Sequence, residues 1–149
     1  MTDRESGCFD ESILLSFPFM HWLFHAAFEG EPGRVTKTQF NILANLYSYG
    51  ELTMMQLSRL TGISKEQTTR ALSPLADSGL VTRHISEDNR NYVYVSLTPE
   101  GRSRMQALLR RCTSRLNKLA GERMTPDELK ELGKHLTAVR LLIRKLISR

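Results

Sequence analysis

Apolar residues recur at helical spacing in three consecutive segments near the middle of the chain. This period predicts helices over residues 36–49, 53–61 and 64–78. Each segment opens with Ser or Thr followed three residues later by Gln, a capping box in which each side chain satisfies a backbone N–H of the first turn. A glycine follows each segment, as is typical where a helix ends. The last two helices, joined by a glycine-containing turn, predict a helix-turn-helix.

The hydrophobic period changes after Gly79. Residues 80–86 and 92–97 are rich in β-branched and aromatic side chains, and the polar segment 87–91 lies between them. This pattern predicts a two-stranded hairpin over residues 80–97. A helix-turn-helix followed at once by such a hairpin is a winged helix.

The last third of the chain has the pattern of two long helices, over residues 98–121 and 125–148. Thr98 and Thr125 each precede a proline, which is favoured at the first helical position because its missing N–H would have no partner there. Along the second helix, apolar residues step alternately by three and four positions, as in a heptad seam. These residues are Leu129, Leu132, Leu136, Val139, Ile143 and Leu146.

A small chain has a limited core in which to bury this seam, so we expect a homodimer. The aromatic segment 13–28 is expected to pack with the last two helices, both within and between subunits. Phe17 of that segment joins the seam residues at the expected interface. The alternative is a purely intramolecular helical bundle.

These elements predict a mainly α fold with a small β-hairpin wing. We expect an N-terminal aromatic helix within residues 1–33, a winged helix-turn-helix over residues 34–100, and C-terminal helices over residues 101–149. The first and last parts would together form a dimerisation region attached to one DNA-binding domain.

The composition is that of a globular protein with a basic C-terminal region. Hydrophobic residues make up 40% of the chain, charged residues make up 25%, and the net charge is +5. Residues 101–149 carry thirteen Lys or Arg and four acidic residues, whereas residues 1–33 carry one Arg and six acidic residues. A basic balance permits nucleic-acid binding, but solvated helix faces explain the C-terminal excess equally well.

The most apolar stretch, residues 13–28, is too short for a comfortable membrane span and is interrupted by Pro18 and two histidines. The N-terminus lacks the positive region of a secretory signal. We therefore expect a cytoplasmic protein that does not bind a membrane. The two cysteines make neither a disulfide framework nor a metal quartet.

The second helix of a helix-turn-helix reads bases with its N-terminal part. Here that part is polar, and glutamine pairs with adenine, arginine with guanine, and a threonine methyl group with the thymine methyl. Thr68 and Thr69 are poor helix formers, so helix propensity does not explain them. The residues expected at DNA in this helix and at the start of the 36–49 helix are Thr36, Lys37, Ser64, Lys65, Gln67, Thr68, Thr69 and Arg70.

Pro74 lies within this reading helix, although proline removes a backbone hydrogen bond from a helix interior. The lost bond is the one to the carbonyl of Arg70, and it falls after the reading residues. We predict that the helix continues with a bend between Arg70 and Pro74. The alternative is a helix that stops at Ser73, followed by a second turn.

Four features of residues 52–102, in this order, resemble the multiple-antibiotic-resistance regulator (MarR) family. They are the winged helix, the run GLV with an arginine two residues later, a wing with the sequence DNR, and the sequence LTPEG entering a long helix. With the flanking helices, the resemblance spans residues 10 to 148. The additional residues that it places at DNA are Arg83, Asp88, Asn89 and Arg90.

The resemblance implies an obligate homodimer whose first and last two helices interlock, with two winged helices on a pseudo-palindromic operator. Residues 65–70 would lie in the major groove. Arg90 would enter the minor groove from the wing tip, where negative potential attracts arginine, and Asp88 would brace it. A plain turn is the alternative for the wing tip, because Asp and Asn are turn formers. The chain departs from the family pattern at Pro74 and at Asn91.

Members of this family often respond to small phenolic or lipophilic molecules, to oxidation or to metals. His21 and His25 lie one helical turn apart, so they share a helix face. We expect this face to line a ligand pocket, with Trp22 and Phe28 nearby. The alternative is a pair of partly exposed histidines without a ligand.

A metal- or redox-sensing regulator of the same fold is a lesser alternative. No spacing of further ligands indicates a metal site. Acidic neighbours of Cys8 raise the pKa of a thiol and argue against a reactive thiolate there. Cys112 falls on an apolar stripe and is expected in the core.

We therefore predict a homodimeric, sequence-specific DNA-binding regulator of transcription, a repressor that binds a pseudo-palindromic operator. A small lipophilic or phenolic ligand would release it, and no cofactor is expected. The alternative is a winged-helix module for protein–protein interaction that binds no DNA. An enzyme is not indicated, because the sequence has no nucleophile–base pair, no phosphate-binding glycine loop and no metal-ligand cluster.

Overall fold

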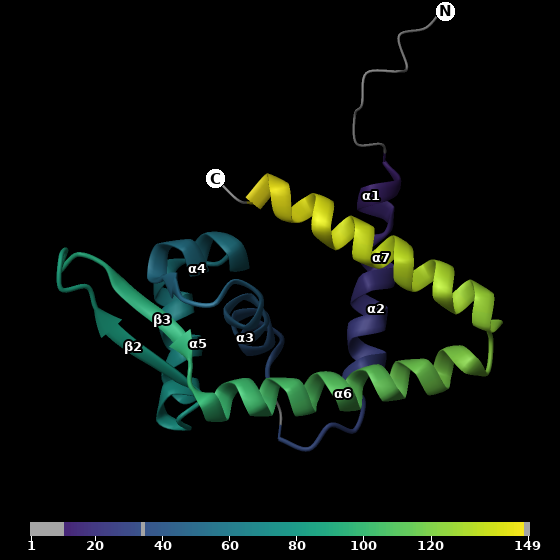
Figure 1. Cartoon of the computed structure of the whole chain (residues 1–149), viewed down its shortest axis with the longest axis horizontal. Helices are drawn as coiled ribbons and strands as arrows, with labels where there is room; N and C mark the ends of the chain where they lie inside the picture. Colours follow the sequence, from purple (N-terminus) through teal and green to yellow (C-terminus); the bar gives the residue numbers. More distant parts are fainter. Residues whose placement is uncertain (1–10, 34, 148–149) are drawn as a thin grey trace, which may run out of the picture.

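The computed structural model describes residues 11–33 and 35–147 (Figure 1). It confirms the mainly α fold with a β-hairpin wing. The elements in chain order are α1 (Ser12–Leu15), α2 (Phe17–Phe28), α3 (Lys37–Tyr49), β1 (Leu52–Thr53), α4 (Met54–Thr61), α5 (Lys65–Asp77), β2 (Val81–Ile85), β3 (Val93–Leu97), α6 (Pro99–Gly121) and α7 (Pro126–Ile147).

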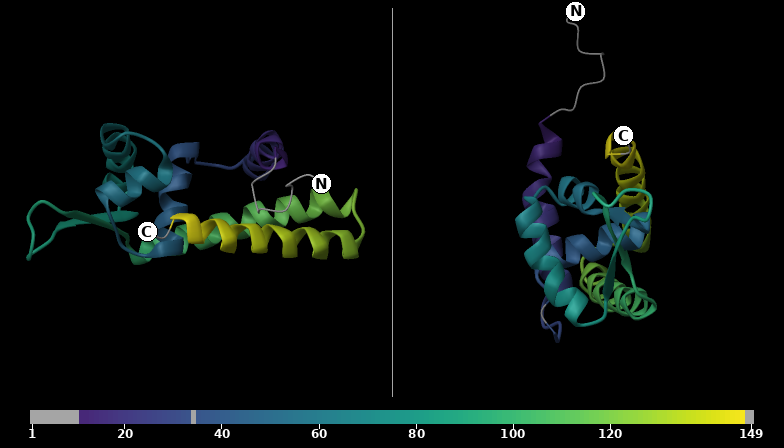
Figure 2. Two further views of the ribbon diagram at one scale, coloured as in Figure 1. Left: turned by 90° about the horizontal axis from the view of Figure 1, so that it is seen from above. Right: turned by 90° about the vertical axis from the view of Figure 1, so that its left-hand side faces the viewer.

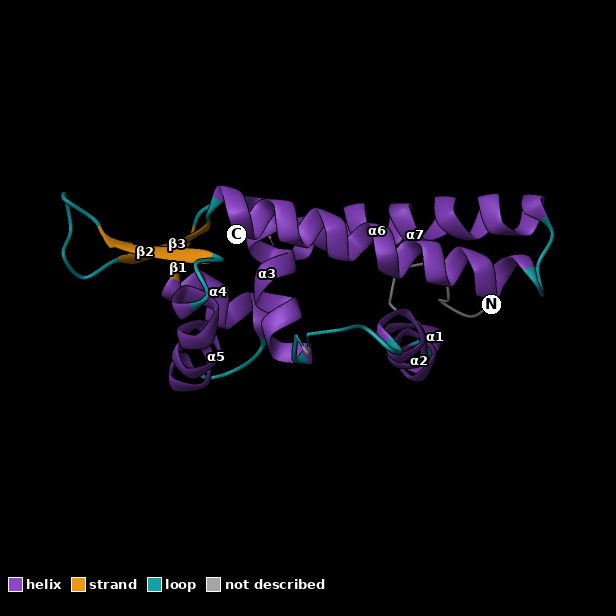
Figure 3. Ribbon diagram, turned by 90° about the horizontal axis from the view of Figure 1, so that it is seen from below, coloured by secondary structure: helices purple, strands orange, loops and turns teal. Residues whose placement is uncertain are grey.

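Helix α6 connects the two parts of the molecule. Figure 1 shows the winged helix, from α3 to β3, at the start of α6, and α2 against the other half of α6. Helix α7 folds back from the end of α6 (Figure 1), and a loop joins α2 to the winged helix (Figure 3). The division of the chain at residues 33 and 100 stays a prediction, and α6 belongs to both parts because its first half packs into the winged helix.

The hydrophobic core lies between the elements of the winged helix and the first half of α6. Side chains of α3, α4, α5, β3 and the first half of α6 fill it, each at most 5% exposed. They are Ile42, Leu43, Leu46, Leu57, Leu72, Leu75, Val95, Met105 and Leu108. In contrast, α7 has no buried residue and α2 has one, Ala27. The core therefore holds the DNA-binding part together and leaves the helices at both ends of the chain poorly covered.

The predicted helix starts are confirmed by their caps. Thr36, Thr53 and Ser64 each form a complete capping box with the glutamine three residues later. The Thr98 hydroxyl accepts a hydrogen bond from the backbone N–H of Gly101 at 3.0 Å. Thr125 and Glu128 exchange hydrogen bonds in the same way at the start of α7. Short-range polar chemistry thus sets where five helices begin.

The sheet has one strand more than the sequence pattern predicted. The order is β1-β3-β2, all antiparallel, and Leu52 of β1 pairs with Val95. Two residues are too few to show a period of two, so β1 has no signal in the sequence. It attaches the wing to the turn between α3 and α4.

Helix α5 continues through Pro74 to Asp77, so the alternative of a helix that stops at Ser73 is wrong. Buried Leu72 and Leu75 hold the helix to the core on both sides of the proline. Beyond it, the N–H of Leu80 donates to the carbonyl of Leu75, and Gly79 has φ +70°, as in a Schellman cap. The bend near Pro74 stays a prediction.

Pro18 lies in the first turn of α2, after the N-cap position of Ser16. The Ser16 hydroxyl makes no capping hydrogen bond to α2 and donates to the carbonyl of Ile13 at 2.6 Å, because residues 12–15 form the separate helix α1.

Candidate nucleic-acid interface

The first turns of α5 present polar side chains to solvent. Lys65, Thr69 and Arg70 are exposed. The Thr69 hydroxyl donates to the carbonyl of Lys65 at 2.9 Å, which leaves its methyl group and a lone pair for a ligand. Arginine and lysine at this end of a recognition helix have the chemistry to bind guanine edges or phosphates.

Ser64 and Gln67, both expected at DNA, also hold the start of the helix. The side-chain oxygen of Gln67 accepts the Ser64 N–H at 3.1 Å, and the Ser64 hydroxyl accepts the Gln67 N–H at 3.1 Å. The Gln67 side chain therefore lies back over the first turn, with its amide N–H groups left to donate. Reading an adenine with both amide atoms would compete with this cap.

The expectation that Thr68 contacts DNA is wrong. Its side chain is 0% exposed, and its hydroxyl donates to the carbonyl of Ser64 at 2.9 Å. Thr68 shares a helix face with Leu72 and Leu75, both buried in the core. The spacing of four and then three residues in the sequence was the signal for this inward position.

The start of α3 lies beside the recognition helix. A groove of about 430 Å³ is lined by Thr36 and Gln39 of α3 together with Gln67 and Arg70 of α5. The groove combines a helix N-terminus, with its partial positive charge, and an arginine, so it suits a phosphate of the DNA backbone. The sequence predicted that Thr36 and Arg70 both contact DNA, but it did not show that they are neighbours.

Lys37 lies on the other side of this helix start. Its Nζ is 5.7 Å from the centroid of the Phe24 ring of α2, and its charge is the largest cause that lowers the pKa of His21. Lys37 is exposed but lies toward α2, so it is separated from the groove at Thr36.

The wing extends beyond the helices as a two-stranded ribbon with a loop at its tip (Figure 2). Arg83 pairs with Val95 across the strands, and its guanidinium donates to the Ser73 hydroxyl of α5 at 3.4 Å. Arg83 therefore connects the wing to the recognition helix. This contact depends on the packing of β2 against α5 and has no sequence signal.

The wing tip carries Asp88, Asn89 and Arg90, all exposed. The Asn89 side chain accepts the N–H of Asn91 at 3.1 Å, so Asn89 forms the turn in addition to any contact with DNA. The predicted brace between Asp88 and Arg90 is not formed: among the described residues, no ion pair joins them. Two exposed side chains in water gain little from such a pair.

The helices at the two ends of the chain enclose a hollow of about 450 Å³. Helix α2 contributes Trp22 and Leu23, α6 contributes the segment around Leu116, and α7 contributes Leu132 and Leu136. Together with Leu129, these two residues of α7 are half of its predicted seam, and they face their own chain across an unfilled space. Leu132 and Leu136 remain 39% and 38% exposed.

The predicted ligand pocket is corrected by this arrangement. Trp22 lines the hollow, but the two histidines lie on the exposed side of α2, with ring centroids 4.5 Å apart. His21 and His25 do share a helix face, as predicted. Phe28 stacks on Phe24 at 4.4 Å and packs against the winged helix instead of lining the hollow.

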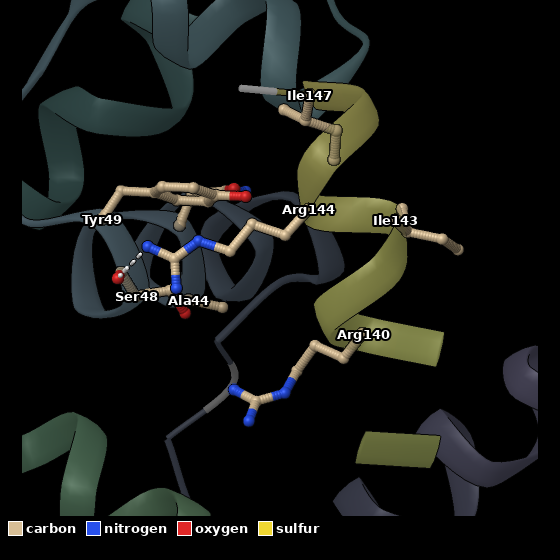
Figure 4. Close-up of a pocket in the computed structure, with 8 residues that line it drawn as sticks. Ala44, Ser48, Tyr49, Arg140, Ile143, Arg144 and Ile147 are labelled. Atoms are coloured by element: carbon tan, nitrogen blue, oxygen red, sulfur yellow. Dashed lines mark hydrogen bonds between the residues drawn. The ribbon is translucent and has the colours of Figure 1, made fainter. Parts of the chain in front are cut away.

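A second hollow, of about 250 Å³, lies between α3 and α7 (Figure 4). Arg144 of α7 lies over the ring of Tyr49, 4.5 Å from its centroid, and donates to the carbonyl of Ser48 at 3.4 Å. Arg140 projects from the preceding turn of α7 (Figure 4), and Ala44 and Ile147 supply apolar walls. The sequence pattern did not indicate this combination of apolar walls and two arginines.

The remaining candidates for chemistry are few. Cys112 is 6% exposed, and burial raises the pKa of its thiol, which agrees with the expected core position. Cys8 lies outside the described residues. Within residues 11–33 and 35–147, no three side chains of His, Cys, Asp or Glu come together as metal ligands. No helix of that part is long and apolar enough to cross a membrane.

Comparison with known proteins identifies the fold. The model of the MarR family matches residues 35–90. The multiple antibiotic resistance protein MarR of Salmonella typhimurium is 27% identical over 101 residues, which cover 68% of this chain and 70% of that protein.

Two solved structures have the same architecture. The structure of FabT from Streptococcus pneumoniae in complex with DNA has a TM-score of 0.62 at 21% identity and covers 91% of this chain and 96% of FabT. The structure of NadR in complex with 4-hydroxyphenylacetate has a TM-score of 0.63 at 19% identity, with 93% and 96% covered. Members of the family regulate transcription and are not enzymes. Residues 35–90 therefore match the MarR family, and the chain has the winged-helix fold of these solved structures.

Proposed function

We propose that the protein is a cytoplasmic homodimer that binds a pseudo-palindromic operator and represses transcription until a small phenolic or lipophilic molecule releases it. The observation that carries the proposal is the recognition helix. Its exposed Lys65, Thr69 and Arg70 lie beside the groove at the start of α3, so one surface offers both base-reading and phosphate-binding groups. The exposed Arg90 of the wing adds a group for the minor groove.

The exposed apolar surface of the terminal helices supports the homodimer. Phe17, Phe19 and Trp22 of α2 are 55–70% exposed, and Val139 and Leu146 of α7 are 50% and 64% exposed. A surface this apolar marks an interaction site in a soluble protein. The occupant that fits is a second copy, whose helices would enter the hollow beside Trp22 and bring two recognition helices onto one operator.

The first test is selection of a binding site from random duplex DNA, followed by affinity measurements on the enriched site. We expect an inverted repeat with half-site centres about one helical turn apart, roughly 34–36 Å. Failure to enrich any site, with only weak salt-labile binding, would favour a protein–protein interaction module instead.

Replacing Arg70 by alanine is expected to weaken binding to the selected site by about 10- to 100-fold, because a bidentate contact to guanine contributes roughly 1–3 kcal/mol. Arg104→Ala is the matched control, because Arg104 is an exposed arginine of α6 whose side chain pairs only locally with Glu100. Fluorescence anisotropy on the selected and a scrambled duplex measures both. Equal loss of affinity in the two variants would contradict base reading by Arg70.

The effector part of the proposal is supported by the hollow between α3 and α7. Its apolar walls and its two arginines suit a small aromatic acid, and the NadR structure contains such a molecule. We expect 4-hydroxyphenylacetate at millimolar concentration to lower the operator affinity of the wild type, and Arg140→Ala to remove that response. Arg110→Ala, on α6 outside this hollow, is the control. An unchanged response in Arg140→Ala, measured by anisotropy, would place the effector elsewhere.

A further inference from the structure

Glu31 joins the connection between α2 and α3 to the middle of α6. The Nη2 atom of Arg111 lies 2.5 Å from its Oε1, and the Nη2 atom of Arg115 lies 3.3 Å from its Oε2. The partners are 80 and 84 residues apart in the chain. The two arginines cover the carboxylate, so the Glu31 side chain is only 5% exposed. These are charge-assisted contacts with a planar donor, which fix direction as well as distance.

Arg115 also holds the end of α2. Its Nη1 donates to the backbone carbonyl of Ala27, in the last turn of that helix. The final carbonyls of a helix lack partners within the helix and carry partial negative charge, so a guanidinium is a suitable cap. One arginine therefore contacts both the end of α2 and the segment that follows it.

The segment between α2 and α3 contains two glycines in backbone conformations that other residues rarely adopt. Gly30 and Gly33 have φ of +68° and +79°, on both sides of Glu31 and Pro32. The N–H of Glu31 donates to the carbonyl of Phe28 at 3.2 Å. Beyond this bond, the Glu31 carboxylate connects this segment to Arg111 and Arg115 of α6.

Helix α6 carries this restraint to the DNA-binding surface. Its first half is part of the winged-helix core through Gly101, Met105 and Leu108. Its second half holds α2 at Arg115, and Figures 1 and 3 show α2 well separated along α6 from α5. The angle between α2 and α6 therefore determines how a partner bound on α2 is placed relative to the recognition helix.

We propose that Glu31 is a positioning residue for operator binding. Together with Arg111 and Arg115 it holds α2 against α6 and thereby sets the separation of the two recognition helices in the homodimer. The inference rests on the proposed function, because it needs two subunits on two half-sites. Half-sites are spaced rigidly along the duplex, so a dimer with a defined separation discriminates between spacings.

The test compares Glu31→Gln with wild type on the selected operator and on versions with one or two base pairs inserted or deleted between the half-sites. We expect the variant to bind the operator of selected spacing about tenfold more weakly than the wild type does. It should bind the operators of altered spacing nearly as well as the wild type, so that the difference in affinity between spacings becomes smaller. Affinity for an isolated half-site should not change. Hydrogen exchange of the backbone N–H groups within residues 28–33 without DNA should become about tenfold faster.

Glu100→Gln is the matched control, because this substitution makes the same change of charge. Glu100 pairs with Arg104 at 3.0 Å, within one turn of α6. Arg111→Gln is the second variant, should Glu31→Gln fail to fold, because it leaves the bond between Arg115 and Ala27 in place. Unchanged spacing preference in a folded variant would overturn the proposal, even with faster exchange. If the wild type selects no operator, the proposed function itself is refuted. If the wild type and the variant both select the same spacing, only the role of Glu31 is refuted.

Discussion

Replacing Leu136 and Val139 together by glutamate is expected to convert the protein into a monomer and to abolish specific operator binding. The two side chains lie on the seam of α7 and are 38% and 50% exposed in the single chain. Full burial of a Leu or Val side chain stabilises by about 1.5–3 kcal/mol, and a dimer can bury only the part that is still exposed, so the four side chains contribute roughly 3–5 kcal/mol. Buried, unpaired carboxylates add a further cost.

The change in oligomeric state is measured by analytical ultracentrifugation at micromolar concentration. Circular dichroism should show a folded winged helix, because neither residue belongs to the core. Lys134→Glu with Thr137→Glu is the control, since these exposed positions have the same spacing on the opposite face of α7. A Leu136→Glu, Val139→Glu protein that remains dimeric would show that the seam is not the interface.

Replacing Gly101 by alanine is expected to destabilise the winged helix. A Cβ at this position would lie 1.9 Å from the carbonyl oxygen of Leu80 and 2.8 Å from its carbon, both backbone atoms. The same joint contains the hydrogen bonds from Thr98 to the carbonyls of Gly79, at 2.6 Å, and Leu80, at 3.1 Å. The start of α6 would have to move away from the end of α5, with loss of these bonds.

We expect a loss of about 2–3 kcal/mol in the free energy of unfolding, as for overpacked core positions. The melting temperature should then fall by roughly 5–10 °C for a chain of this size. Gly121→Ala at the end of the same helix is the control, because its Cβ would meet nothing within 4 Å. It should leave the melting temperature equal or slightly higher. Equal melting temperatures for Gly101→Ala and wild type in thermal unfolding would contradict the close approach of α6 to Leu80.

The sequence by itself determined the positions of the helices and of the wing. Thr36, Ser64 and Thr98 begin helices through hydrogen bonds to residues three positions away, so the chemistry that sets these boundaries is local. The same holds for Gly79, whose positive φ ends the recognition helix. The β-branched and aromatic residues of the hairpin, on both sides of a polar turn, also needed no partner from elsewhere in the chain to be recognised.

The sequence placed most of the candidate DNA contacts on the correct element but could not always tell which way they face. Thr68 is polar and lies among reading residues, yet it is buried because it shares a face with Leu72. Lys37 stands next to Thr36 in the sequence but lies toward Phe24. Polarity alone assigns a residue to a surface, and only the packing of neighbouring elements shows which surface or whether it is covered.

Contacts between distant parts of the chain were decided only by the tertiary structure. Glu31 meets Arg111 across 80 residues, Arg70 meets the start of α3, and Trp22 lines a hollow with α7 while its neighbour His21 does not. A capping box or a glycine turn acts over three or four residues, so its signal is written in the order of the chain. The direction of a side chain toward another element depends on the angle at which helices cross, and that angle results from the packing of many side chains together.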